Sequence, residues 1–222
     1  ESSMKPFFAL ARHGSSPKGF TLVELIVAIS IMVMILTITL SSRPDAINRL
    51  TLADEVSSVH LMLRQAQLQG SSINSLGGTY GGAGVYFDLA TSTRVMFFRD
   101  KTDGATPSLL GVGNGIYDQN LALESYENFR FSRGNRIKKL CVSLSTSTPL
   151  CNDDNTPAVK NLTISFDRPS TEANIYINNA TETKYVTGCI EVNGIKAPEE
   201  GYVRSVFVYK SGMMEKKVGP CM

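Results

Sequence analysis

The chain has 222 residues, of which 42% are hydrophobic and 19% are charged, and its formal net charge is +2. This length and composition allow one modest globular domain beside a membrane anchor, and we expect a single domain. Residues 1–19 contain three basic residues and one acidic residue, so the rest of the chain has 19 Lys and Arg against 19 Asp and Glu. This balance excludes a strong overall electrostatic attraction of that part to nucleic acid.

The first predicted element is an apolar helix at 20–40. This run of 21 residues contains one ionisable side chain, that of Glu24. A helix of this length crosses the hydrocarbon core of a bilayer. Three basic residues and one acidic residue precede it: Lys5, Arg12, Lys18 and Glu1. Because a positive flank stays in the cytoplasm, we expect residues 20–42 to form a single membrane span with a cytoplasmic N-terminus.

Glu24 is an expensive residue in such a segment. A carboxylate at the centre of a membrane helix costs roughly 2.5–3.5 kcal/mol on insertion scales, so a lone acid there usually has a partner. Cleavage after Gly19 would create an α-amino group on Phe20, which would be largely protonated at neutral pH. That amine would lie about one helical turn from Glu24 or on a neighbouring copy, so we expect it to supply the counter-charge.

Gly19, Phe20, Thr21, Leu22 and Glu24, followed by the long apolar run, resemble the class III signal of type IV pilins and type II secretion pseudopilins. The resemblance implies that a prepilin peptidase removes residues 1–19 as a leader peptide and methylates the new amine of Phe20. It also implies that Glu24 steers the subunit into a filament of pilin or pseudopilin subunits at an inner-membrane assembly platform. The protein would first be stored in the inner membrane and then occupy a periplasmic or extracellular filament.

Two other interpretations of the apolar run are weaker. It could be an ordinary bitopic anchor in which Glu24 merely lies near the membrane interface. A conventional secretory signal fits less well, because its apolar core has about 7–15 residues and ends in small residues, whereas this run is longer and has no such site.

A second helical pattern covers 43–69. Its apolar residues recur at intervals of four and three, as in a helix that lies on a core: Leu52, Val56, Val59, Leu63 and Ala66. We place Glu55 on another, polar face. Leu61 and Leu68 also lie off the stripe, so they are either contacts for neighbouring subunits or ordinary surface leucines.

The junction and the end of this helix have their own signals. Helical character is expected to continue from the membrane segment to residue 69, and Pro44 at the junction is expected to kink or locally loosen the helix by removing one hydrogen bond. Gly70 is expected to end the helix, because glycine adopts the left-handed conformation on which helices often end.

After residue 70 the pattern changes to short strands separated by turns. We expect a flexible loop at 77–84 and an acidic turn at Asp100 and Asp103. Strands are expected at 84–88, 93–98, 137–144, 161–166, 173–177, 187–192 and 202–209, with a terminal strand after a turn at Ser211 and Gly212. Because no amphipathic helix separates them, we expect an antiparallel sheet. The predicted fold class is α+β, with a long N-terminal helix packed on a β-rich domain of residues 70–222.

Parts of this domain resemble the H-type minor pseudopilins and their pilus relatives. The resemblance is carried by residues 63–67, by the glycine-rich passage into 84–88, and by 162–169 followed by two strands. It implies that the protein is a minor subunit of its filament.

Four cysteines lie in the part expected outside the cytoplasm: Cys141, Cys151, Cys189 and Cys221. An even number in an exported domain favours disulfides, with three possible connectivities. Cys141 and Cys151 enclose nine residues, a spacing suited to pinning a hairpin or loop, and Cys189 with Cys221 would tie down the last strands. A structural zinc site is disfavoured, because there is no Cys-x-x-Cys and His60 is far upstream. We therefore expect no metal.

One segment is rich in cations: Arg130, Arg133, Arg136, Lys138 and Lys139, with Phe129 and Phe131 beside them. Such a segment could bind nucleic acid through phosphate pairing and base stacking. The alternative, which we favour, is a solvated hairpin whose two phenylalanines face the core, because charge runs are usually surface.

Catalysis has little support in the sequence. His60 is the sole histidine after the leader, and no catalytic set can be assembled around it. The glycines at 111–115 lack the spacing of a phosphate-binding loop. We expect no enzymatic activity and no cofactor. The rival function is a bitopic surface module whose β domain binds DNA, a surface or a partner, with the helix only as a tether.

Overall fold

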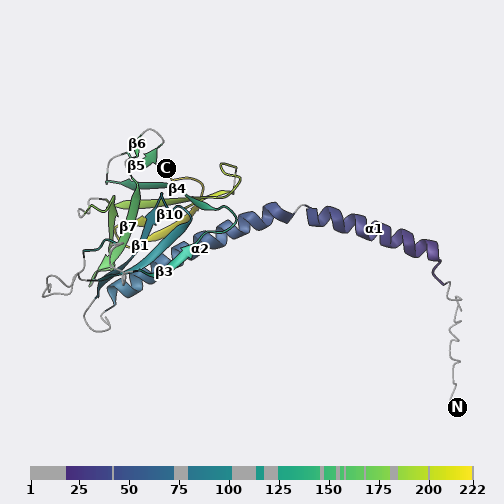
Figure 1. Ribbon diagram of the computed structural model, residues 1–222, viewed down its shortest axis with the longest axis horizontal. Helices are drawn as coiled ribbons and strands as arrows, with labels where there is room; N and C mark the ends of the chain where they lie inside the picture. Colours follow the sequence, from purple (N-terminus) through teal and green to yellow (C-terminus); the bar gives the residue numbers. More distant parts are fainter. Residues whose placement is uncertain are drawn as a thin grey trace, which may run out of the picture. The chain divides into compact units, whose positions relative to one another are not determined.

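The computed structural model describes residues 19–41, 43–72, 80–101, 114–117, 125–145, 148–153, 156–157, 159–167, 169–180, 185–199 and 201–221. The chain divides between Pro44 and Asp45 into two compact units. The first contains helix α1 (Leu22–Ser41), and the second contains nearly all of helix α2 (Arg43–Ser71) and all the strands (Figure 1).

The two helices lie on either side of residue 42, which is outside the described residues. α1 ends at Ser41 and α2 begins at Arg43, which places Pro44 in the first turn of a new helix. Proline is tolerated there because the N–H groups of a first turn have no partner within the helix. Pro44 therefore lies beside the boundary between the two helices, where the sequence predicts a kink or a local loosening of the helix.

The strands form two antiparallel sheets. Sheet A has the order β3-β2-β1-β7-β8 and sheet B the order β11-β10-β9-β4-β5-β6. The strands are β1 (Tyr80–Asp88), β2 (Arg94–Lys101), β3 (Ser125–Arg130), β4 (Arg136–Ser143), β5 (Leu150–Asp153), β6 (Thr156–Pro157), β7 (Asn161–Asp167), β8 (Ala173–Ile177), β9 (Thr187–Asn193), β10 (Val203–Tyr209) and β11 (Met214–Val218). Every strand expected from the sequence is present, which confirms the α+β class. Strands β3, β5 and β6 were not predicted.

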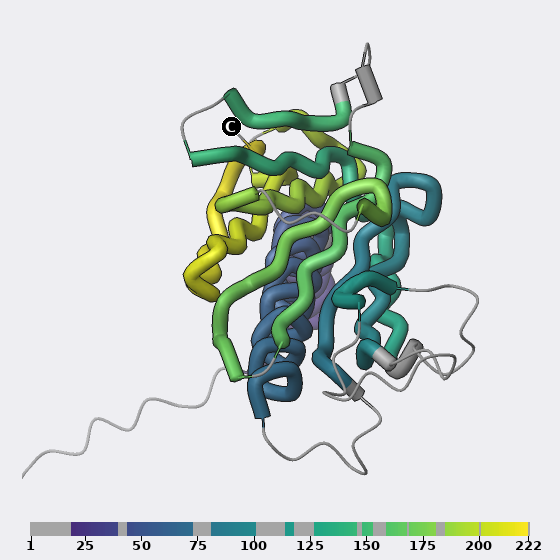
Figure 2. The backbone as a smooth tube through the Cα atoms, turned by 90° about the vertical axis from the view of Figure 1, so that its left-hand side faces the viewer, coloured from purple at the N-terminus to yellow at the C-terminus, as the bar shows by residue number. Residues whose placement is uncertain are grey.

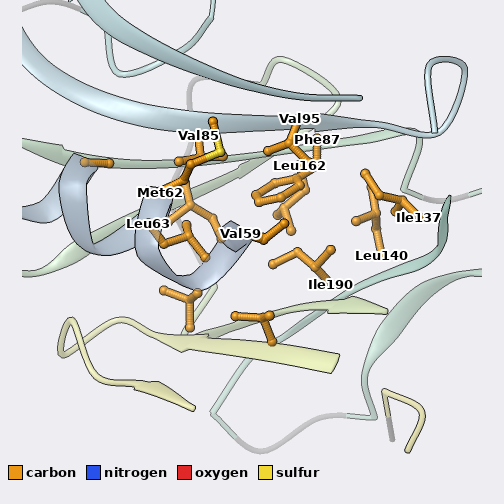
Figure 3. Close-up of a cluster of buried hydrophobic side chains, with 14 of the residues drawn as sticks. Val59, Met62, Leu63, Val85, Phe87, Val95, Ile137, Leu140, Leu162 and Ile190 are labelled. Carbon is orange, nitrogen blue, oxygen red and sulfur yellow. The ribbon is translucent and has the colours of Figure 1, made fainter. Parts of the chain in front are cut away.

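Helix α2 runs through the middle of its domain, with β9–β11 on one side and β1–β3 on the other (Figure 2). The predicted stripe is confirmed, because its five residues are all buried. Val59 and Leu63 pack among side chains of both sheets, such as Phe87 and Ile190 (Figure 3). One core therefore joins the two sheets through the helix.

Gly70 has a different role from the one predicted. It lies inside α2, which ends one residue later, and no left-handed conformation is found there. A Cβ at Gly70 would instead collide with the backbone carbonyl of Phe166 on β7. The glycine allows the end of the helix to approach sheet A closely.

The predicted glycine loop is partly a strand. β1 begins at Tyr80, so Gly82 and Gly84 lie in a central position of sheet A. A Cβ on Gly84 would be 2.6 Å from the ring of Phe98 on the neighbouring strand. Asp100, expected in a turn, lies in β2 opposite Gly82 and is fully buried. The small glycines make room for larger side chains of the adjacent strands.

We predict that two alanine substitutions of leucine on α2 will have very different effects on stability. Leu63 is 0% exposed and Leu61 is 65% exposed. Leu63→Ala should lower the free energy of unfolding by about 2–5 kcal/mol through lost burial and a cavity. Leu61→Ala should change it by less than about 0.5 kcal/mol. Urea unfolding of the full chain in mild detergent, followed by tyrosine near-UV circular dichroism, measures both. Equal losses would show that α2 does not pack as described.

Candidate functional site at the head of the chain

The head of the first unit is an exposed segment that leads into a helix. Gly19, Phe20 and Thr21 are exposed and precede α1. A Cβ added at Gly19 would meet no heavy atom within 4 Å. The backbone on both sides of the Gly19–Phe20 bond is therefore open to another protein such as a peptidase.

Thr21 acts as the N-cap of α1. Its Oγ1 accepts a hydrogen bond from the backbone N–H of Glu24 at 3.3 Å, and its carbonyl accepts the first helical bond from Leu25 at 3.2 Å. This arrangement satisfies one of the free N–H groups of the first turn. It also places the Glu24 carboxylate in the first turn, where the helix dipole favours a negative charge.

The rest of α1 is suited to an apolar environment. Residues Leu22–Thr39 are long and apolar enough to cross a membrane, and none of this stretch is buried within the protein. The hydroxyls of Ser30, Thr37 and Thr39 donate to backbone carbonyls three or four residues earlier, at 2.8–3.0 Å. These polar groups are thereby satisfied inside the helix, as a lipid surrounding requires.

Comparison with known families finds a match in the N-terminal segment of the chain. Residues 15–40 match the prokaryotic N-terminal methylation motif. This motif is the signal of type IV pilins and pseudopilins, and it spans Gly19, Phe20 and Glu24. It implies processing by a prepilin peptidase and assembly with other pilins, and together with the apolar helix it implies anchoring in the inner membrane. Proteins with the motif are structural. No curated protein and no solved structure matches the chain.

The second unit, which contains α2 and the strands, has two disulfides. Cys141–Cys151 joins directly opposed residues of β4 and β5, and Cys189–Cys221 ties β9 to the C-terminal tail. This is one of the three connectivities that the sequence allowed. By the loop-entropy model each bridge contributes about 2–4 kcal/mol to stability. Within the described residues, no group of three or more His, Cys, Asp or Glu could hold a metal ion.

The cationic segment is divided between the two sheets. Arg130 ends β3 in sheet A, whereas Arg136, Lys138 and Lys139 belong to β4 in sheet B, with Arg133 in the connection between them. The predicted hairpin is therefore wrong, because β3 pairs with β2 and β4 pairs with β9 and β5. Four of the five cations are exposed, and Lys139 is half-buried.

The two phenylalanines of this segment face inward, as expected. Phe131 belongs to the main core, Phe129 packs against it, and their rings meet edge to face at 5.3 Å. They are not presented for stacking on bases. Nucleic-acid binding by this segment stays a prediction that would depend on its exposed cations alone.

Glu55 has a role that its expected place on a polar face does not predict. Glu55 is buried, and its carboxylate holds the connection between the sheets. Oε1 accepts hydrogen bonds from the N–H and hydroxyl of Ser132 at 2.7 and 2.6 Å, and Oε2 accepts one from Nδ2 of Asn135 at 2.7 Å. Its place three residues after Leu52 and one before Val56, at the margin of the apolar stripe, was the one available signal.

His60 lies on α2 beside the start of β11. It is half-buried on α2, and burial lowers its pKa, as do the nearby charges of Lys216 and Arg64. The imidazole ring of His60 forms a hydrogen bond with the backbone of Met214.

Proposed function

We propose that the protein is a subunit of a type IV pilus or of a type II secretion-like filament, stored in the inner membrane and assembled after removal of residues 1–19. The observation that carries this proposal is the methylation motif at 15–40, which places Gly19 and Glu24 at the exposed start of an apolar, membrane-length helix. Residues 20–42 would be the membrane and filament-core segment, 43–69 the amphipathic helix, and 70–222 the β-rich outer domain.

Assembly is the mechanism in this proposal. In the membrane, the side chains of α1 contact lipid, and the large apolar residues of Leu22–Thr39 are available because the protein itself buries none of this stretch. On extraction, contacts with helices of other subunits replace the lipid contacts. The Glu24 carboxylate then meets the amine of Phe20, either on its own chain or on a neighbouring copy, so charge neutralisation and subunit register are coupled.

The finer assignment is to a minor subunit of the H type. It is supported by the order of sequence features in residues 70–222 and by the helices α1 and α2 that precede the antiparallel strands in the chain. The partners in this proposal are the prepilin peptidase, other pilin or pseudopilin subunits, and the inner-membrane assembly platform. Leu61 and Leu68, exposed on α2, are candidates for contact with neighbouring subunits.

Intact-mass measurement with N-terminal sequencing of protein extracted from native membranes tests the proposal. We expect a chain that begins at Phe20 and carries the additional mass of one methyl group. A sequence that begins upstream and still contains Lys18 would contradict it and favour the tethered binding module. Recovery of the protein in sheared filaments separates the same two functions, because a tethered module would stay with the membrane.

A further inference from the structure

Three cysteines form one row across three adjacent strands of sheet B. Cys141 of β4 is directly opposite Cys151 of β5 on one side and directly opposite Cys189 of β9 on the other. Directly opposed residues of antiparallel strands point to the same face of a sheet. The next residues of these strands, such as Leu140 and Ile190, belong to the main core, so the three cysteines point away from it.

The row forms a packed cluster with the last cysteine of the chain. Cys141, Cys189 and Cys221 are only 2%, 3% and 5% exposed, whereas Cys151 packs against them and is partly exposed. The Cys189–Cys221 bond is covered, because both of its cysteines are buried. A reagent in solution therefore reaches the Cys141–Cys151 bond most easily at Cys151.

Cys141 has two cysteines within reach, although it is bonded to one of them. The Cα atoms of directly opposed residues in antiparallel strands are about 4.5–5.5 Å apart. A disulfide accepts Cα separations of about 4.4–6.8 Å, so the positions of Cys141 and Cys189 suit a bond without movement of the backbone. The β4–β9 ladder extends from Arg136 to Ser143 and keeps these two cysteines opposed.

The C-terminal tail depends on Cys221 for its covalent attachment to sheet B. Cys221 is joined to Cys189 on an interior strand of the sheet. Hydrogen bonds also hold the tail: from the N–H of Gly219 to the carbonyl of Val203, from the hydroxyl of Ser205 to the carbonyl of Gly219, and from the N–H of Cys221 to the carboxylate of Glu191. Each hydrogen bond contributes little net free energy, because water replaces it when the tail opens. A new partner for Cys189 would therefore loosen the tail.

We infer that Cys141 is an exchanging cysteine: when a dithiol reduces its bond to Cys151, Cys141 bonds to Cys189 instead and releases the C-terminal tail. A thiolate of the dithiol attacks the sulfur of Cys151, and the Cys141 thiolate leaves. The second thiol of the reductant then attacks the reductant's own sulfur in this mixed disulfide. That attack frees Cys151 as a thiol and converts the reductant into a cyclic disulfide.

The second exchange takes place within the protein. The Cys141 thiolate attacks the sulfur of Cys189, and the Cys221 thiolate leaves and takes up a proton. The dithiol has supplied two electrons and two protons, so the protein keeps one disulfide and gains two thiols, at Cys151 and Cys221. The row thereby couples the redox state of the accessible Cys151 to the attachment of the tail. The inference does not depend on filament assembly.

Two serine variants test the internal step. Cys151→Ser and Cys141→Ser remove the same disulfide, so they lose the same cross-link, but they leave different thiols. The thiol left by Cys151→Ser lies opposite Cys189. The thiol left by Cys141→Ser lies on β5, two strands from β9 and about 9.5 Å away. Of the two variants, we therefore expect only Cys151→Ser to transfer its bond and to free Cys221.

The measurement is alkylation of the full-length variants in mild detergent with excess N-ethylmaleimide, followed by tryptic digestion and mass spectrometry. Trypsin places the four cysteines in three peptides: 140–160, 185–196 and 218–222. In Cys151→Ser we expect the first two peptides to be linked to each other. We also expect at least about tenfold more alkylated Cys221 than in Cys141→Ser, since only the first variant holds its thiol against the second disulfide. Equal alkylation of Cys221 in the two variants would overturn the inference.

The unaltered protein gives a second, independent result. One equivalent of dithiothreitol, a dithiol, should produce the same link between the first two peptides, with alkylation at Cys151 and Cys221. Alkylation at Cys141 and Cys151 with the Cys189–Cys221 bond intact would show two independent disulfides and would also overturn the inference.

Discussion

Replacing Gly19 with serine is expected to leave residues 1–19 on essentially all of the protein. The cleavage that we propose follows Gly19, and a peptidase that must approach the backbone closely there requires a residue without a side chain. A Cβ at Gly19 meets no atom of the chain within 4 Å, so the substitution leaves the described structure unchanged. Any loss of cleavage would therefore arise in the complex with the peptidase. Intact mass of the membrane-extracted variant measures the retained leader.

Gly14→Ser is the matched control for this experiment. Gly14 is followed by two serines and not by an apolar run, so its replacement should not affect processing. Normal cleavage of Gly19→Ser would exclude the processing site proposed here, whereas loss of cleavage in both variants would show that the leader as a whole, and not Gly19, is recognised.

Replacing Glu24 with valine is expected to reduce incorporation into filaments by about tenfold or more, because a charge-assisted pair in a low-dielectric environment is lost. The amount of processed protein in the membrane should not fall, since the variant makes α1 more apolar. The ratio of protein in sheared filaments to protein in the membrane, measured by quantitative immunoblotting, gives the effect.

Thr21→Val separates the charge of Glu24 from its part in the helix start. It removes the hydroxyl that accepts from the N–H of Glu24, at a cost of about 1 kcal/mol to the first turn, but leaves the carboxylate in place. Incorporation of this variant should stay near that of the parent protein. If Glu24→Val enters filaments as well as the parent does, pairing with the Phe20 amine is not what guides assembly.

Several features could be predicted because they depend on neighbours in the sequence. The head of the chain is a local pattern of a glycine, an acid and an apolar run, and its family match covers this region alone. The buried stripe of α2 follows from helical periodicity, and most strands follow from short β-branched and aromatic runs between turns. The disulfides were expected from cysteine number, although spacing alone did not fix their pairing.

The tertiary structure decided what depends on residues far apart in the chain. The sequence predicts a loop at Gly82. In the structure Gly82 lies between Asp100 and Asp167, because β1 pairs with β2 on one side and with β7 on the other. The sequence predicts that Glu55 lies on a polar face. In the structure the connection between β3 and β4, 77 residues later, supplies the hydrogen-bond donors that allow Glu55 to be buried. A local pattern cannot show which strand will be the neighbour, and so it cannot show which side chains will share a face.

Three features could be predicted from local patterns alone: the membrane-length helix with Glu24, the apolar stripe of α2 that faces the core, and the antiparallel strands. Each depends on the spacing of residues that are close together in the chain. The arrangement of two sheets with α2 between them, and the attachment of the C-terminal tail to β9, could be seen in the folded protein alone. Strand pairing and the Cys189–Cys221 bond set these two features. Both join residues that are far apart in the chain, so no local pattern in the sequence indicates them.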